Sequence, residues 1–422
     1  MPDNTTLRND KNKKAKILIV HNHYQIPGGE DTVVENEKKL LEENGHEVVL
    51  YTRNNNEIKT MSRLKKLLLP IMTVCNPRSA RDVKQIIKSE GIDIVHVHNT
   101  LNLISPSVYY AAVTCGVPVV QTIHNFRFIC PGAALYRDGH ICEDCIQKGL
   151  GCAIKHGCYR NSKAQTLILV ISVLLHKAAG IYGKLNYICL TGFNREKLLT
   201  LNGKREVIPP SQVFVKPNFT FSPPSGMQKR REGQDGPMSF IYVGRLDELK
   251  GIQTLFEAWS LMGEEAPLLR VCGSGPMQDW CVQRSQGLHV EMKGFLDSAS
   301  VNQLIADSRA LIMPTLWYEG FGMTVIEAFS CGVPVICSDL GNAGSLVEEG
   351  VTGWKFRPGD AQALAQAVRK AMGDGSGVRD NARRVFAEKY SPEANYRRLE
   401  EIYMEVRHAN RSAGSQRRKF RK

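Results

Sequence analysis

The chain has 422 residues, too many for one ordinary domain, so two or three domains are expected. Hydrophobic residues make up 42% and charged residues 23%, which excludes a wholly disordered or fibrous protein. The formal net charge is +13, and most of it lies at the ends: residues 1–16 hold five basic and two acidic side chains, and residues 407–422 hold seven basic ones and no acid. Such tails favour contact with a polyanion such as an anionic membrane surface, and solubility alone is an equally open explanation.

Short apolar runs alternate with segments of helical periodicity in both halves of the chain, which predicts doubly wound α/β domains. In the first half the expected strands are 16–20, 47–51, 92–97, 118–123 and 186–191, and the expected helices are 31–44, 80–89, 105–114 and 195–201. In the second half the expected strands include 239–243, 268–272 and 334–337, with a helix over 252–261.

A stretch rich in glycine, proline and charge, residues 222–237, divides the two halves. The predicted organisation is a tail (1–15), a first Rossmann-like domain (16–222), a linker (223–237), a second Rossmann-like domain (238–391), an apolar-striped helix (392–406) and a tail (407–422). Ligands of such domains bind at the carboxyl ends of the strands, so we expect two domains that face each other across a cleft. No apolar run of bilayer length and no signal-peptide core occurs, which predicts a cytoplasmic protein.

Three glycine-bearing turns follow predicted strands of the second half. The first, at 244–251, contains Arg245 and Lys250, two cations that could clamp a diphosphate. The second is the turn at 272–276. In the third, Glu319 precedes a turn and a helix start near Met323, whose N–H groups favour an anion, and Glu327 lies about one turn further on.

With these motifs the chain resembles the retaining GT-B glycosyltransferases of group 1, or family 4, from Lys16 to about Tyr403. The resemblance rests on Pro-Gly-Gly at 27–29, Val-His-Val-His at 95–98, His124, Val-Lys-Pro-Asn at 215–218, Gly-Arg…Lys-Gly at 244–251 and the two glutamates at 319 and 327. It implies a hexosyl transfer from a nucleotide-diphosphate sugar to a saccharide or lipid-linked saccharide, in polysaccharide or glycolipid synthesis. The first domain would then bind the acceptor and the second the donor, and the helix at 392–406 would cross back onto the first.

The resemblance also implies residue roles. Arg245 and Lys250 would neutralise the diphosphate, Glu319 would bind the transferred sugar, and His124 would face the reacting sugar, although a structural histidine is the alternative at that position. The expected donor-binding residues are Gly28, Gly29, Gly244, Gly320, Phe321, Gly322, Met323, Thr324 and Glu327. The fixed positive charges would stabilise the leaving diphosphate without a catalytic metal, so no cofactor is required for the reaction.

Five cysteines crowd into a predicted insertion at 130–160: Cys130, Cys142, Cys145, Cys152 and Cys158. This insertion is poor in apolar residues, so it needs another source of stability. A structural zinc held by thiolates is the leading hypothesis, and an iron–sulfur cluster, thiols without metal and disulfides are the alternatives.

The segment at 164–184 is a predicted helix with an apolar run from Leu167 to Leu175 and basic ends. We expect a buried core helix, because the run is apolar nearly all round; a face that rests on a bilayer is the alternative. Two other functions stay open for the chain. One is a GT-B nucleotide-sugar epimerase or hydrolase, and the other is a zinc-stapled polyanion-binding protein. Nucleic acid is a poor partner because aromatic residues do not interleave with the basic ones.

Overall fold

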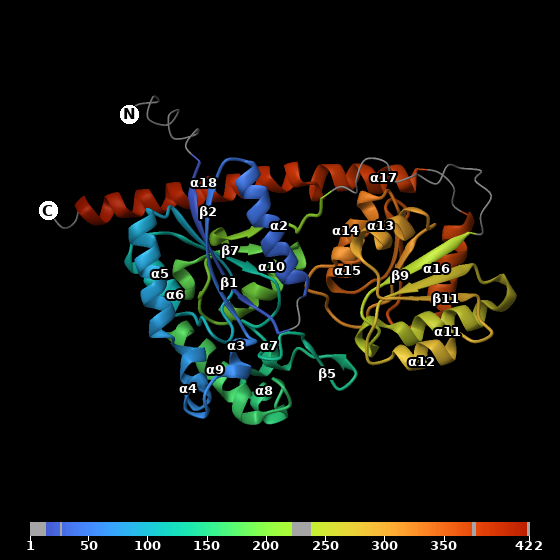
Figure 1. The fold of residues 1–422 in the computed structure, drawn as a ribbon, viewed down its shortest axis with the longest axis horizontal. Helices are drawn as coiled ribbons and strands as arrows, with labels where there is room; N and C mark the ends of the chain where they lie inside the picture. The colour runs from blue at the N-terminus through green and yellow to red at the C-terminus, as the bar shows by residue number, and fades with distance from the viewer. Residues whose placement is uncertain (1–13, 26–27, 222–237, 374–376, 420–422) are drawn as a thin grey trace. The chain divides into compact units, whose positions relative to one another are not determined.

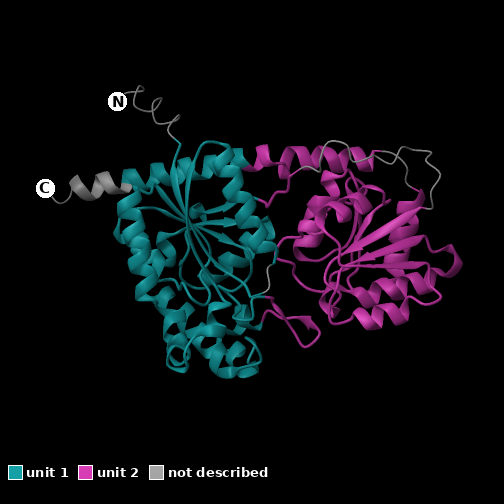
Figure 2. Cartoon of the chain, in the orientation of Figure 1, with its two compact units in different colours: residues 1–133, 144–216, 396–422 teal, residues 134–143, 217–395 magenta. Residues whose placement is uncertain are grey.

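The structure is a computed structural model that describes residues 14–25, 28–221, 238–373 and 377–419. The chain divides into two compact units (Figure 2). Unit 1 comprises residues 1–133, 144–216 and 396–422, and unit 2 comprises residues 134–143 and 217–395. The linker expected at 223–237 and the tail expected at 1–15 lie outside the described residues, apart from residues 14 and 15.

Unit 1 is built on a parallel six-stranded sheet of order β2-β1-β3-β4-β7-β8. Its strands are β1 (Lys16–His23), β2 (Glu47–Asn54), β3 (Ile94–Asn99), β4 (Val119–Ile123), β7 (Asn186–Cys189) and β8 (Val213–Val215). Its α-helices are α2 (Gly29–Glu43), α3 (Glu57–Thr60), α4 (Arg63–Val74), α5 (Pro77–Glu90), α6 (Ser107–Thr114), α7 (Asp144–Lys148), α8 (Gly151–His156), α9 (Lys163–Ala178) and α10 (Gly192–Leu199).

The central strands of unit 1 are buried on both faces. All of β3 and β4 is buried, and β1 is buried except at its two ends, as expected of strands covered by helices on both sides. The strand order reverses next to β1, which has β2 on one side and β3 on the other. In an open α/β sheet such a switch point, at the carboxyl ends of the strands, is where ligands bind.

Unit 2 repeats this architecture with a parallel sheet of order β11-β10-β9-β12-β13-β14. Its strands are β9 (Ser239–Val243), β10 (Leu268–Cys272), β11 (Val290–Gly294), β12 (Leu311–Met313), β13 (Val335–Ser338) and β14 (Gly353–Phe356). Its α-helices are α11 (Ile252–Met262), α12 (Gln278–Arg284), α13 (Ser298–Ala306), α14 (Met323–Ser330), α15 (Gly341–Leu346), α16 (Ala361–Gly373) and α17 (Val378–Val385).

The core of unit 2 lies where α11 and α16 cover the sheet. Its largest members are aromatic: Phe240 of β9, and Phe256 and Trp259 of α11, all with no exposed surface. The Trp259 ring pairs edge-on with Phe240 at 6.2 Å, and its indole N–H donates to the carbonyl oxygen of Pro267 at 2.8 Å. The switch point of this sheet lies between β9 and β12. The turn with Arg245 and Lys250 directly follows β9.

The last helix, α18 (Pro392–Lys419), starts in unit 2 and from Tyr396 onward belongs to unit 1. The Tyr403 hydroxyl lies 2.7 Å from Nδ1 of His96 in β3, and the Arg407 guanidinium lies 3.4 Å from Asp93. Leu399 and Ile402 are fully buried. The helix thus packs along its apolar stripe onto unit 1. It also continues to Lys419, so most of the expected tail at 407–422 is helical.

Two local features differ from the sequence-based expectation. The expected helix at 164–184 ends at Ala178 and is followed by a 3₁₀ turn at Tyr182–Lys184. Only one face of α9 is buried, so the prediction of a core helix is wrong for the opposite face. Within the insertion, a short antiparallel hairpin of β5 (Tyr136–Arg137) and β6 (His140–Ile141) belongs to unit 2, whereas α7 and α8 belong to unit 1.

Candidate functional site

The two residues expected to bind phosphate and sugar in unit 2 are in direct contact. Nζ of Lys250 lies 2.8 Å from Oε1 of Glu319, and the Glu319 side chain is nearly buried. The same Oε1 accepts hydrogen bonds from the Thr315 hydroxyl at 3.0 Å and the Trp317 indole at 2.9 Å. Three donors therefore fix this carboxylate at the carboxyl end of β12, beside a cation.

Arg245 joins the same cluster through Asp247. The Arg245 guanidinium forms an ion pair with Oδ2 of Asp247, and Oδ1 of Asp247 accepts the backbone N–H of Lys250 at 3.0 Å. The Arg245 side chain is 64% exposed, so most of its five donors face solvent. The Asp247 carboxylate thus fixes the conformation of the turn at 244–251, which carries both Arg245 and Lys250.

Glycines allow the turns after β9, β10 and β12 to pack backbone against backbone. Gly251 has φ of +69° and lies so close to Pro314 that a Cβ would collide with the Pro314 carbonyl oxygen. Gly273 has φ of +137°, and a Cβ there would collide with the carbonyl oxygen of Gly244. Only glycine combines this conformation with this approach. A Cβ on Gly244 itself would lie 3.1 Å from the Tyr242 hydroxyl.

The turn before α14 completes the cluster. The Asn342 amide donates to the carbonyl oxygens of Glu319 at 2.6 Å and Gly320 at 2.9 Å, and Gly322 precedes the helix with φ of +116°. The first N–H groups of an α-helix form a site for an anion. Met323 and Thr324 stand at this helix start and are half-buried.

Two other expected donor-binding residues lie deeper. The Phe321 side chain is buried and contacts the Tyr390 ring, with 6.3 Å between ring centroids, so only its backbone faces the turn. Glu327 lies one turn into α14, where burial raises the pKa of its carboxyl group. The structure therefore brings Arg245, Lys250 and Glu319 together, and Glu319 lies four residues before the start of α14.

In unit 1, His124 follows β4 and contacts another histidine. Nε2 of His124 and Nδ1 of His98 are 2.9 Å apart, and the rings stack with centroids 5.2 Å apart. Burial lowers the pKa of His98 to about 4 and places that of His124 well below its usual value. Both imidazoles are therefore neutral at pH 7, and each can offer one N–H donor and one acceptor.

A fully buried ion pair lies beneath these histidines. Oε2 of Glu37 in α2 is 3.1 Å from Nζ of Lys216, and each side chain is 1% exposed. Oε1 of Glu37 is 2.9 Å from Nδ1 of His96 and 3.4 Å from Nε2 of His98. Burial alone would raise the pKa of Glu37, but Lys216 and His96 outweigh it and hold that pKa well below its usual value.

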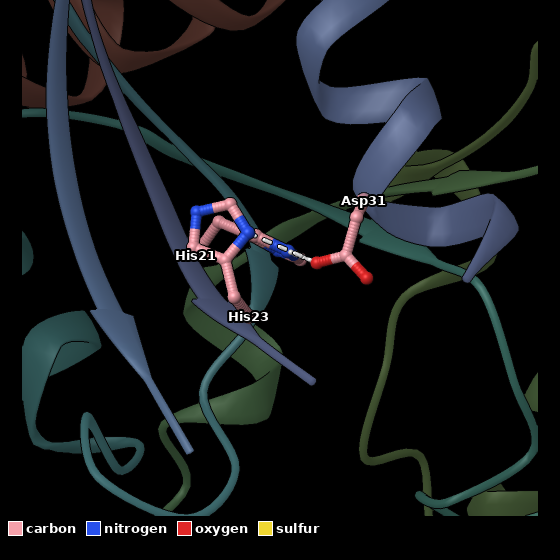
Figure 3. A group of neighbouring side chains, drawn as sticks. All are labelled: His21, His23 and Asp31. Carbon is pink, nitrogen blue, oxygen red and sulfur yellow. Dashed lines mark hydrogen bonds and ion pairs between the residues drawn. The ribbon is translucent and has the colours of Figure 1, made fainter. Parts of the chain in front are cut away.

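A second histidine–carboxylate group lies at the end of β1 (Figure 3). The rings of His21 and His23 both point at Asp31, with ring nitrogens 2.9 and 3.0 Å from Oδ1. Oδ2 of Asp31 accepts the backbone N–H of Gly28 at 2.9 Å. The N–H of Gly28, an expected donor-binding residue, thus donates to a carboxylate at the start of α2, where Gly29 is the first helical residue.

Two groups in unit 1 have the donor types and spacing of a cation site: His21, His23 and Asp31, and Glu37, His96 and His98, with donor atoms within 4.8 Å of one another. In the second group the Lys216 ammonium lies beside the Glu37 carboxylate and already neutralises its charge. The first shares one carboxylate oxygen between two imidazoles, as a hydrogen-bonded group does.

A pocket of about 90 Å³ opens beside His124 within unit 1. Polar groups from the ends of β3 and β4 line one part of it, and apolar groups of α9 line another. The polar lining includes His98, Asn99, Thr100, Gln121, Thr122, His124, Asn125 and Arg127. This combination suits a ligand with a polar or anionic part and an apolar part.

The five cysteines of the insertion are divided between the units. Cys142 belongs to unit 2, and Cys130, Cys145, Cys152 and Cys158 belong to unit 1. Burial, together with the nearby Cys130, Cys158 and Cys152, raises the pKa of Cys145 to about 12. A Cβ on Gly132 would lie 3.4 Å from Cβ of Cys158 and 3.8 Å from Sγ of Cys130. The unit 1 cysteines are therefore neighbours, and a bound metal stays a prediction.

The sequence analysis did not single out Glu37, His21, His23 or Asp31. A signal for Glu37 was present, because it occupies the apolar face of α2 together with Val33, Val34, Leu40 and Leu41. A charged residue at such a position needs a buried partner. Its partner Lys216 is 179 residues away, and no local pattern connects the two.

Two family models match the chain. Residues 227–391 match "Glycosyl transferases group 1" and residues 27–141 match "Glycosyltransferase Family 4", which together cover 280 of the 422 residues. A two-domain α/β fold whose second sheet has two cations at its switch point is an architecture that glycosyltransferases use, and the matched models define the class of this chain as glycosyltransferase. Within that class, the chain belongs to the group 1/family 4 glycosyltransferases, and the expected family is confirmed.

Named relatives match one part of the chain. A glycogen synthase of Mycobacterium tuberculosis is 31% identical over 159 residues, 36% of this chain and 38% of the relative. The O-antigen chain mannosyltransferase B of Escherichia coli is 30% identical over 144 residues, 32% and 37% of the two chains. The chain therefore spans less than two fifths of the length of these relatives.

Solved structures match the chain nearly end to end. A glycosyltransferase of Rickettsia africae has a TM-score of 0.64 and 19% identity, over 93% of this chain and 99% of that one. HepE of Anabaena in complex with UDP has a TM-score of 0.63 and 18% identity, over 92% and 100%. At this identity the likeness shows the fold, and the expected GT-B fold is confirmed. In the described part of the chain, no helix is both long enough and apolar enough to cross a bilayer.

Proposed function

We propose that this chain is a retaining glycosyltransferase that moves a hexosyl-type sugar from a nucleotide-diphosphate donor to a saccharide or lipid-linked saccharide acceptor. The observation that carries the proposal is the contact of Lys250 with Glu319, with Arg245 held beside them, at the start of α14. Relatives named for O-antigen and colanic acid synthesis support polysaccharide or glycolipid assembly, and a structural neighbour solved with UDP supports a nucleotide donor.

The donor diphosphate would lie against Arg245, Lys250 and the first N–H groups of α14. The Lys250 ammonium group would donate one of its N–H groups to a phosphate oxygen in addition to Glu319. The Glu319 carboxylate would accept a hydrogen bond from a sugar hydroxyl. Glu327 would bind the nucleotide ribose. As the bond between the anomeric carbon and the phosphate oxygen breaks, the electron pair stays on the diphosphate, and fixed positive charge stabilises it.

The acceptor oxygen would attack the anomeric carbon on the face that the diphosphate leaves. A leaving-phosphate oxygen would take the acceptor proton, so the sugar keeps its anomeric configuration without a dedicated base. His124 and the pocket beside it are the proposed acceptor-side groups of unit 1. A neutral His124 suits hydrogen bonding to a hydroxyl, because Nε2 contacts His98 and leaves Nδ1 to donate or to accept according to the tautomer.

We also propose a structural zinc for the cysteines of the insertion, with an iron–sulfur cluster as the alternative metal. The clustered thiols of unit 1 support it, because zinc would convert closely spaced thiols into thiolate ligands. The tails and surface charge also suit contact with an anionic membrane.

Incubation of the purified chain with a panel of nucleotide-sugars, with and without a saccharide acceptor, tests the proposal. Acceptor-dependent release of nucleoside diphosphate and a glycoside of retained configuration are expected. Turnover of the donor alone would instead favour the epimerase or hydrolase. A chain that binds polyanions but no nucleotide-sugar would favour the zinc-stapled scaffold.

A further inference from the structure

One end of unit 1 exposes large apolar side chains on two helices that pack against each other. α4 and α9 are in contact, α8 contacts α9, and Figure 1 places the three together at this end of the unit. Eight side chains of α4 and α9 are between 41% and 74% exposed: Leu64, Leu67, Leu68, Ile71, Leu167, Ile171, Leu174 and Leu175. Single exposed leucines are ordinary, but eight large apolar side chains exposed on two helices that contact each other mark an interaction surface.

The exposed residues of α9 form a stripe of helical periodicity. Leu167, Ile171 and Leu174 follow one another at spacings of four and three, whereas Leu169 and Val173 on the other face are buried in unit 1. The buried face accounts for the packing of α9 onto the unit. Between 41% and 50% of each side chain of the stripe stays exposed, so its apolar character calls for a second apolar environment.

The charges carried by the three helices have one sign. Neither α4, α8 nor α9 contains an aspartate or glutamate, and they present the exposed basic residues Arg63, Lys65, Lys66, Lys155 and Lys163. An apolar stripe bordered by lysine and arginine is the composition that binds the interface of an anionic bilayer. We propose that this surface, the α4–α9 face, docks on an anionic lipid bilayer, with its leucines at the boundary between headgroups and acyl chains.

The α4–α9 face lies on the same helices as the pocket beside His124. Thr73 of α4 and Leu169, Ser172 and Val173 of α9 line that pocket from the inner side of the two helices. Docking would bring the pocket within about one helix diameter, ~10 Å, of the lipid surface. A lipid-linked acceptor could then enter it from the bilayer. This last consequence depends on the proposed function, whereas bilayer binding does not.

Vesicle co-sedimentation of the full chain tests the proposal. The vesicles contain phosphatidylcholine alone or phosphatidylcholine with phosphatidylglycerol. The test variant is Leu64→Ser/Leu67→Ser/Ile71→Ser/Leu174→Ser, and the matched control is Leu261→Ser/Val282→Ser, which changes exposed apolar residues of α11 and α12 in unit 2. We expect binding to the anionic vesicles, a loss of at least about tenfold in the test variant and no change in the control.

A second variant, Lys65→Glu/Lys66→Glu, leaves the apolar residues in place and is expected to weaken binding only to the vesicles with phosphatidylglycerol. Thermal unfolding and the Kd for a nucleoside diphosphate, expected to match the wild type, verify that each variant is folded. Absence of binding by the wild type would overturn the proposal, as would equal binding by the four-serine variant. Light scattering could instead show a dimer of the wild type and a monomer of the four-serine variant. That result would assign the α4–α9 face to a second copy of the chain and would also overturn the proposal.

Discussion

Nζ of Lys250 lies 2.8 Å from Oε1 of Glu319, a residue 69 positions further along the chain. The contact connects the turn after β9 to the turn after β12, on the two sides of the switch point of unit 2. The Lys250 side chain is partly exposed, whereas that of Glu319 is nearly buried. An incoming phosphate can therefore reach the Lys250 ammonium group and compete with Glu319 for it. The first prediction follows from this contact.

Lys250→Ala is expected to lower kcat/KM by at least about tenfold, since one charged donor to the leaving group is lost. Arg245→Ala is expected to have a similar effect. Lys370→Ala, which removes an exposed lysine from α16 of the same unit, is the matched control and should leave kcat/KM unchanged. Steady-state kinetics with the donor found in the panel measures all three. Wild-type kinetics in both test variants would contradict the role of the two cations.

Replacement of Gly251 is expected to destabilise unit 2, because the Pro314 backbone lies against it. Gly251→Ala should lose more stability than Gly287→Ala, although both glycines have positive φ, because a Cβ at 251 meets Pro314 whereas one at 287 meets nothing within 4 Å. The backbone penalty shared by both variants is about 1–2 kcal/mol. Thermal unfolding of the two variants measures the difference. Equal losses would show that the turn after β9 does not depend on the close approach.

The buried pair of Glu37 and Lys216 is expected to be essential for the stability of unit 1. Lys216→Met should lower the free energy of unfolding by about 3–5 kcal/mol, because it leaves the buried Glu37 carboxyl group without its compensating cation. The double variant Glu37→Gln/Lys216→Met should recover part of that loss. Urea denaturation measures both. A single variant as stable as the wild type would mean that the pair contributes nothing.

Stability should also fall between pH 6.5 and pH 5. The pKa of His98 is about 4 in the folded chain and about 6.5 in the unfolded one, so in this range the unfolded state binds more protons. The contribution of His98 is therefore complete above pH 6.5 and is lost as the pH falls. Thermal unfolding over this range should show a decrease that His98→Gln makes smaller. An unchanged slope in the variant would contradict the assignment to His98.

The zinc proposal predicts about one metal ion per purified chain. Elemental analysis measures it, and Cys145→Ser should lose the metal, because Cys145 is the thiol surrounded by the other unit 1 cysteines. Cys189→Ser, which changes a buried cysteine of β7, is the control that should retain it. A wild-type chain without stoichiometric metal would contradict the proposal.

The sequence predicted the repeating strands well because their apolar runs are local signals. The run at 239–243 became β9 with the predicted bounds, and the glycines after it placed Arg245 at a strand end. α9 was harder. Its residues are apolar all round, and only the packed structure shows that Leu169 is buried whereas Leu174 is exposed.

Contacts between distant segments could not be predicted from local patterns. The pairing of Glu37 with Lys216 depends on how α2 and the end of β8 meet in the folded unit. Likewise, Asp31 accepts the N–H of Gly28, a residue that the family resemblance places among the donor-binding ones. Such details follow from side-chain packing, whereas the motif specifies only which residues come near each other.

The most direct test of the central claim is calorimetric titration with a nucleoside diphosphate and with the matching nucleoside, using the wild type and Arg245→Ala/Lys250→Ala. If the two cations and the start of α14 hold the diphosphate, the double variant should bind the diphosphate at least about 100-fold more weakly and the nucleoside equally well. An equal Kd for the diphosphate in the two proteins would contradict the account.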